Sequence, residues 1–401
     1  MSQSATEKYL NNYAEQEVHL LKDFPIRTYN NVLIIPAYQE SKAFIDQYLV
    51  TDYWDQSLLI ILIINQPDDD NNELAQQNLF NSIHASSYTL WQQHPLSLFK
   101  HSDNKPHILC INRFESELRL NPKKAVGHAR KIAADCALYL IHKQIIASDW
   151  ICSTDADASL PKNYFSVVNE QINAQALTFN YQHQTGDDDL SRATTVYEQG
   201  LKYYQAGLEW ANSPYAFHSL GSCIAVNKQA YVSVRGFPKR AGGEDFYLLN
   251  KLAKLGTIIH LVDTTITIAS RTSQRVPFGT GPAVEKIMQL QSIANYPYYH
   301  PNIFIELKTC LKAFSNLQTQ HTLQSWLDCF NEPTTKALLA IGIEKYYQHH
   351  LKQSISQRRL LPDLNTWFDG LTTLKYIHYL RDHYWPNIPL SESLQIAPYY
   401  S

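Results

Sequence analysis

The amino-acid sequence predicts an α/β protein built on a mostly parallel sheet flanked by helices, with a helical extension after it. Short apolar runs alternate with segments of helical spacing through the first two-thirds of the 401 residues. These runs are apolar on both faces, which is typical of parallel strands that helices cover on both sides. From about residue 295 the alternation stops, and the pattern is mostly helical to about residue 384.

The apolar runs place the elements of this sheet in order along the chain. We expect strands at 31–36, 58–64, 107–111, 149–153 and 265–269, and helices at 40–50, from about 73, at 123–146 and from 244 to about 255. The predicted domains are an N-terminal helical segment, 1–29, a sheet domain, 30–294, and a helical extension, 295–401. The extension packs on the sheet domain or forms the contacts of a homodimer.

Composition excludes several classes of protein. Lys and Arg number 34 against 37 Asp and Glu, so the net charge is −3 and no basic surface for nucleic acid is expected. The longest apolar run, 58–64, is far shorter than the roughly 20 residues of a membrane helix, so no transmembrane segment is expected. Six scattered cysteines without a CxxC pair, and an N-terminus without a signal-peptide pattern, predict reduced thiols and a cytoplasmic protein.

Polar side chains follow three of the predicted strands, at the point where each strand ends. Because the carboxyl ends of parallel strands meet at one edge of a sheet, we expect these side chains to line one crevice of the kind that binds nucleotides. They are Tyr38 and Glu40, then Asn65 with Asp68, Asp69 and Asp70, then Asp155 with Asp157.

Asp155 and Asp157 form the sharpest motif of the chain. Two carboxylates so close together can hold one divalent cation, and that cation can bridge a diphosphate leaving group. The same residues also fit a turn whose Asp side chains cap a helix near Pro161. They also fit the DxDx(T/S) motif of haloacid-dehalogenase-type phosphatases, although that motif follows the first strand and this one follows the fourth.

Three further segments carry residues that suit chemistry. Glu244 and Asp245 follow two glycines and begin a helix. A carboxylate there can take a proton from an acceptor hydroxyl. Alternatively, the two carboxylates only stabilise the helix N-terminus through the helix dipole. Arg271 and Arg275 lie in a loop with hydroxyls and glycines that suits a diphosphate or is merely solvated. Segment 123–130 begins the long helix, and its backbone amides and basic side chains could bind a phosphate group. Alternatively, it is a helix start whose lysines are only solvated.

The order of these motifs resembles that of family 2 glycosyltransferases. Segment 35–40 (IPAYQE) resembles their P-x-Y-x-E opening, and segment 127–130 (GHAR) their G-x-A-R helix. Segment 155–157 resembles their DxD, 221–237 their acceptor-side G-S…G-F stretch, and 244–245 their ED pair. The similarity spans about residues 30 to 280, and the ordered set is more specific than any one piece.

The resemblance implies a GT-A fold and a metal-dependent glycosyltransferase. Such an enzyme would move a hexose from a nucleotide-diphosphate sugar to a hydroxyl of a soluble small molecule or glycan. By this analogy Asp245 is the general base of an inverting displacement, Glu244 orients it or the acceptor, and Asp157 with Asp155 holds Mg²⁺ or Mn²⁺. The implied donor-binding residues are Pro36, Tyr38, Glu40, Asn65, Arg130, Asp155, Arg271 and Arg275. The implied acceptor-binding residues are His218, Gly221 and Ser222.

The chain departs from the family pattern at two places. The second strand ends in Asn65 and Gln66 before the acids begin, which leaves uracil and guanine both open as the base. Arg271 stands where the family often supplies a histidine to the metal, so Arg271 and Arg275 are expected to share the metal's work on the diphosphate.

Two other readings stay open beside the phosphatase. A nucleotidyltransferase normally has a Gly-rich basic loop after its first strand, whereas this chain has residues 37–40 (AYQE) there. A catalytically silent GT-A-like scaffold has no need for a set of mutually repelling carboxylates.

Overall fold

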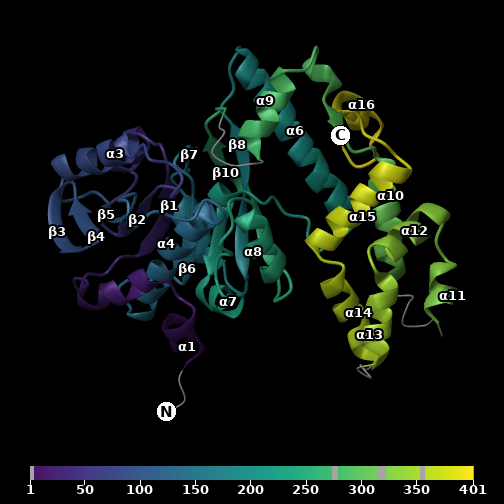
Figure 1. Cartoon of the computed structure of the whole chain (residues 1–401), viewed down its shortest axis with the longest axis horizontal. Helices are drawn as coiled ribbons and strands as arrows, with labels where there is room; N and C mark the ends of the chain where they lie inside the picture. Colours follow the sequence, from purple (N-terminus) through teal and green to yellow (C-terminus); the bar gives the residue numbers. More distant parts are fainter. Residues whose placement is uncertain (1–3, 273–278, 315–321, 353–356, 401) are drawn as a thin grey trace. The chain divides into compact units, whose positions relative to one another are not determined.

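The computed structural model describes residues 4–272, 279–314, 322–352 and 357–400 (Figure 1). The chain divides into two compact units, Met1–Gln184 with Ser219–Gly279, and Thr185–His218 with Thr280–Ser401. The first unit contains the sheet. Compact units need not be folding domains, so the boundaries predicted at residues 30 and 295 stay a prediction.

Ten strands of the described residues form one mixed sheet in the order β3-β4-β5-β2-β1-β6-β9-β8-β10-β7. Its three longest ladders, β8 with β10, β1 with β2, and β2 with β5, are parallel. The bounds are β1 Asn31–Ala37, β2 Leu58–Asn65, β3 Tyr88–Gln93, β4 Leu96–Lys100, β5 His107–Arg113, β6 Trp150–Ser153, β7 Ala158–Ser159, β8 Ala176–His183, β9 Ile224–Asn227 and β10 Ile258–Ile268.

Helices flank this sheet and leave its central strands inaccessible to solvent. Every residue of β2 and β5 is buried, which fits runs that are apolar on both faces. The helices of the first unit, with η for 3₁₀ turns, are α1 Ala5–Asn12, η1 Gln16–Asp23, α2 Ala43–Leu49, α3 Leu74–Ala85, α4 Ala125–His142, α5 Tyr164–Glu170, η2 Gly221–Cys223, α7 Lys228–Ser233 and α8 Glu244–Leu252. The predicted α/β class, with a sheet flanked by helices, is confirmed.

One buried polar cluster, here called the sealed cluster, ties the N-terminal segment to helix α4. Both carboxylate oxygens of Asp135 accept hydrogen bonds: Oδ1 from the Tyr9 and Tyr231 hydroxyls at 2.7 and 2.8 Å, and Oδ2 from Lys131 Nζ at 2.8 Å. Asp135 Oδ2 also accepts the backbone N–H of Glu15 at 2.9 Å. These bonds fix α1 and α7 against the helix that carries Arg130.

The second unit is helical apart from one short β-ribbon in its described residues. Tyr203, Phe304, Trp326 and Tyr376 are among its fully buried core side chains. The elements are α6 Asp189–Trp210, α9 Thr280–Met288, η3 Ile293–Asn295, β11 Pro297–Tyr298, α10 Asn302–Lys312, α11 Leu323–Leu327, α12 Glu332–Ala340, α13 Ile343–Lys352, α14 Gln357–Trp367, α15 Gly370–His383, β12 Ile388–Pro389 and α16 Leu390–Ile396 (Figure 1). The predicted helical C-terminal region is confirmed.

The structure contains strands that the sequence pattern does not reveal. Strand β3 is mostly exposed and polar, so it carries no apolar run. Strand β10 begins at Ile258, earlier than the predicted 265, and its register against β8 shifts between Leu261 and Thr265. Such a bulge interrupts the alternation that a pattern search needs.

Two findings bear on the classes considered above. No helix in the described ranges has both the length and the apolar character that crossing a membrane requires. All six cysteines are free, and five of them are buried while Cys329 is exposed.

Candidate active site

The carboxyl ends of β1, β2 and β6 bring polar side chains of distant sequence together. The Tyr38 hydroxyl, just after β1, donates to Asp70 Oδ2, which follows β2, at 2.7 Å. The guanidinium of Arg271, which follows β10, joins Glu40 to Asp157. All these residues belong to the first unit.

The turn that carries Asp155 and Asp157 is held on both sides by backbone hydrogen bonds. The N–H of Thr154 donates to the Ile34 carbonyl of β1 at 3.1 Å. The Asp157 carbonyl accepts the N–H of Ala269 at 2.8 Å, and β7 pairs with the end of β10. The motif is therefore a fixed corner between two strands, and the side chains of Asp155 and Asp157 are 32% and 20% exposed.

Arg130 lies on α4 beneath this corner and is buried. It donates from Nε to Glu244 Oε1 at 2.9 Å, from Nη1 to the Ser153 hydroxyl at 2.8 Å, and from Nη2 to Asp155 Oδ1. Gly221 makes room for it, because a Cβ there would lie 2.2 Å from Arg130 Nη2. These contacts position the two carboxylates, and direct binding of the nucleotide by Arg130 stays a prediction.

Arg271 is the second cation of the site. Its Nη1 lies 2.7 Å from Glu40 Oε1 and its Nη2 lies 2.7 Å from Asp157 Oδ2. Burial by itself would lower the pKa of Arg271, but the two carboxylates outweigh burial and raise the pKa. Arg275, its predicted partner, lies outside the described residues.

Glu244 and Asp245 form the first turn of α8. Gly243 precedes them with φ of 69°, a left-handed conformation that glycine adopts without strain. Glu244 is buried against Arg130. Burial, followed by the charge of Glu244, raises the pKa of Asp245 to about 7, although Arg130 acts in the opposite direction. A carboxyl group with a pKa near 7 can exchange protons with a substrate at physiological pH.

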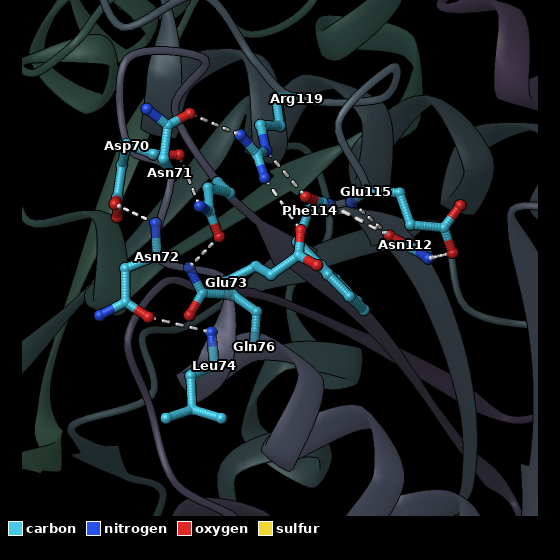
Figure 2. A network of polar contacts seen from close by, with 11 residues as sticks. Asp70, Asn71, Asn72, Glu73, Leu74, Gln76, Asn112, Phe114, Glu115 and Arg119 are labelled. Carbon is cyan, nitrogen blue, oxygen red and sulfur yellow. Dashed lines mark hydrogen bonds and ion pairs between the residues drawn. The ribbon is translucent and has the colours of Figure 1, made fainter.

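A network of side chains shapes the region after β2 (Figure 2). Gln66 donates to the Asp70 carbonyl at 2.7 Å and accepts from Gln76 at 2.6 Å. Arg119 donates to Glu73 at 2.9 Å and to the Phe114 carbonyl at 3.0 Å. Sequence reasoning missed this network, and the adjacent amides Asn65 and Gln66 at the strand end are the signal that could have indicated it.

The remaining predicted residues are placed as follows. Pro36 lies in β1 opposite Ile63, and Asn65 is buried at the end of β2. Ser222 is buried in η2. His218 belongs to the second unit and is nearly buried there.

We define the crevice cluster as five carboxyl groups and two guanidinium groups. They are Glu40, Asp155, Asp157, Glu244 and Asp245 with Arg130 and Arg271. Among these described groups the carboxyl groups outnumber the cations, which favours the binding of a further cation or a proton.

The cluster fits a metal ion in one specific way. Carboxylate oxygens are the ligands that Mg²⁺ prefers, and Mg²⁺ is commonly bound by one or two carboxylates together with substrate phosphates. Within the described ranges, no three His, Cys, Asp or Glu side chains are placed to hold a metal ion by themselves. Asp155 and Asp157 could supply two carboxylate ligands to such an ion, and their role as metal ligands stays a prediction.

Comparison with known proteins gives only distant likenesses. No protein-family model matches the chain, and no curated protein sequence matches it. The crystal structure of GalNAc-T7 with UDP, GalNAc and Mn²⁺ is similar with a TM-score of 0.34 and 11% identity, over 80% of this chain and 56% of that one. The crystal structure of a mycobacterial protein is similar with a TM-score of 0.29 and 12% identity, over 67% of this chain and 70% of that one. Scores this low do not carry a functional conclusion, which has to come from the site.

Proposed function

We propose that the chain is a glycosyltransferase of the GT-A type that transfers a hexose from a nucleotide-diphosphate sugar to an acceptor hydroxyl. The observation that carries this proposal is Asp245, whose pKa is raised to about 7 within a cluster of carboxylates at the carboxyl ends of the sheet. A transferase to a hydroxyl needs a base for the acceptor proton and a positive charge for the leaving diphosphate, and this site offers both.

Asp245 acts as the base in this proposal. Its ionised carboxylate takes the proton of the acceptor hydroxyl while the oxygen attacks the sugar carbon, and the bond from that carbon to the diphosphate breaks. A single displacement of this kind inverts the configuration of the sugar carbon. Glu244 is occupied by Arg130 and buried, so it positions Asp245 and does not take the proton itself.

The leaving diphosphate faces Arg271 and the turn at Asp155 and Asp157. A guanidinium can donate two parallel hydrogen bonds to phosphate oxygens. Asp155 and Asp157 would hold Mg²⁺ or Mn²⁺, which when bound supplies positive charge to the diphosphate. Tyr38, Asn65 and Asp70 lie at the strand ends where the nucleoside of the donor is expected.

The phosphatase alternative fits the contacts less well. It requires Asp155 to attack a phosphorus atom, whereas Asp155 Oδ1 here accepts a hydrogen bond from the buried Arg130. A silent scaffold would gain nothing from a carboxyl group whose ionisation is suppressed by burial and by a neighbouring charge.

The test measures donor binding and transfer separately. The melting temperature of the purified protein is followed with UDP, GDP and their common sugars, each with and without Mn²⁺, for the wild type and Asp157→Ala. Asp149→Asn is the matched control. Asp149 is also an aspartate paired with a cation, Lys228, but it precedes β6, whereas Asp157 comes after β6. Release of the nucleoside diphosphate on adding pooled hydroxyl acceptors then reports transfer.

We expect a metal-dependent rise with one nucleotide that is lost in Asp157→Ala and kept in Asp149→Asn. No shift with any nucleotide, in protein that unfolds cooperatively, would contradict the proposal.

A further inference from the structure

Arg271 joins two carboxylates of the crevice cluster. Its guanidinium contacts one oxygen of Glu40 and one of Asp157, each at 2.7 Å. Asp157 is also the carboxylate that the proposed function assigns to the metal. A divalent cation bound to the same carboxylate would lie close to this guanidinium, and like charges at that separation repel each other.

We infer that Arg271 competes with the divalent cation for Asp157, so that the protein binds the metal tightly only together with a nucleoside diphosphate. This inference rests on the proposed function, and it gives Arg271 a part in the control of metal binding.

The energetic reason lies in what each group loses and gains. A metal that binds alone must break the ion pair between Arg271 and Asp157, and the guanidinium then keeps only Glu40. When a diphosphate is present, its oxygens give the released guanidinium new acceptors, and they also supply ligands to the metal. No covalent bond changes in this exchange.

The local geometry allows the exchange without unfolding the site. The Arg271 side chain is 33% exposed, so its guanidinium already borders solvent. Asp157 is held through its backbone, by the hydrogen bond from the Ala269 N–H to its carbonyl. The backbone of Asp157 therefore stays in place when the partner of its side chain changes. Arg130, in contrast, is buried at 2% exposure and has no comparable freedom.

The experiment measures Mn²⁺ binding directly, by the electron paramagnetic resonance signal of free Mn²⁺, with and without UDP and GDP. It compares the wild type with Arg271→Gln and Arg271→Lys. Lys42→Gln is the charge control. It removes a positive charge two residues from Glu40 in the chain, but the Lys42 ammonium pairs with Asp46 at 3.0 Å and not with Glu40 or Asp157. Circular dichroism melts show whether each variant is folded.

We expect Arg271→Gln to bind Mn²⁺ about tenfold more tightly than the wild type in the absence of nucleotide. Arg271→Lys should lie between the two, because lysine keeps the charge without the two-pronged contact. The gain in Mn²⁺ affinity on adding the nucleotide should be smaller in Arg271→Gln than in the wild type.

Two results would overturn the inference. One is equal Mn²⁺ affinity in the wild type and in both Arg271 variants, including no binding in any of them. The other is an equal gain in Lys42→Gln, which would assign the effect to general charge. Failure of the proposed function is distinguishable, because it would show as tighter Mn²⁺ binding in Arg271→Gln with no binding of any nucleotide.

Discussion

Arg130 and Lys131 are neighbours on α4, yet each anchors a different buried cluster. Lys131 belongs to the sealed cluster, where one cation meets one carboxylate and the side chain of Asp135 is 0% exposed. Arg130 belongs to the crevice cluster, where two guanidinium groups meet five carboxyl groups and Asp155 is 32% exposed. The first is balanced and closed, and the second is acidic and open.

The difference separates a structural role from a functional one. Both oxygens of Asp135 already accept bonds from Tyr9, Tyr231 and Lys131, so no ligand has a place there. In the crevice cluster, burial followed by the charge of Glu244 raises the pKa of Asp245, and the excess of carboxyl groups among its described members favours a cationic partner. A buried charge network therefore marks a site when its charges do not balance and solvent reaches it.

The largest expected effect comes from removing the base of the crevice cluster. Asp245→Asn should lower kcat about a thousandfold, because positioned general bases contribute roughly 10² to 10⁴ in rate. Initial rates of nucleoside diphosphate release measure it. The variant should also melt a few degrees higher than the wild type near about pH 8, since it removes a destabilised charge. A kcat for Asp245→Asn equal to that of the wild type would contradict the assignment of Asp245 as the general base.

The sealed cluster should respond in stability and not in binding. Asp135→Ala leaves buried donors of Tyr9, Lys131 and Tyr231 without their acceptor, which should cost about 3 kcal/mol or more of unfolding free energy. Urea unfolding measures this loss. Donor affinity of the folded fraction should match the wild type, and a selective loss of donor binding would contradict the division between the clusters.

Gly221→Ala should disturb the crevice cluster without touching the sealed one. Its new Cβ would lie 2.2 Å from Arg130 Nη2, so the guanidinium must leave Asp155 or Glu244. We expect a loss of about 2 kcal/mol in stability together with weaker donor binding. Gly256→Ala is the control, because its nearest neighbour is the flexible Gln175 side chain at 3.0 Å. Equal effects in the two variants would contradict this account.

The smallest expected effects concern pH. Protonation of Asp245 below its pKa of about 7 should lower kcat/KM about tenfold per pH unit. Its raised pKa means that its contribution to stability is present at low pH and is lost as the pH rises from about 4 through 7. For the wild type, kcat/KM measured against pH should show the first trend, and the melting temperature measured against pH should show the second. In Asp245→Asn the melting temperature should depend less on pH over this range.

Glu15, which adjoins the sealed cluster, should show the opposite trend. Burial raises its pKa, but His128 and Lys239 outweigh burial and lower the pKa to about 2. Its contribution to stability is therefore present above about pH 4.5 and is lost as the pH falls toward 2. The difference in unfolding free energy between Glu15→Gln and the wild type should shrink over this range, and a constant difference would contradict the ion-pair assignment.

Much of the sheet could be predicted from local pattern. Strands β1, β2, β5 and β6 each contain a short apolar run, and their observed starts lie at or within one residue of the predicted ones. The exposed strand β3 was missed because it has no uninterrupted apolar run, and the bulged start of β10 was missed because its pattern is irregular. The buried strand β4 was also missed, although it is short and mostly apolar. The exposed Asp68 and Asp69 show the limit of the rule that polar residues at strand ends face a crevice.

The sequence by itself determined the alternation of strands and helices, and it placed carboxylates just after buried strands. Both follow from the local periodicity of apolar residues. The tertiary structure alone decided which distant charges meet: Arg130 with Asp155 and Glu244, and Arg271 with Glu40 and Asp157. It also decided the raised pKa of Asp245. The reason is that electrostatic energy depends on distance through space and on burial, and neither can be read from separation along the chain.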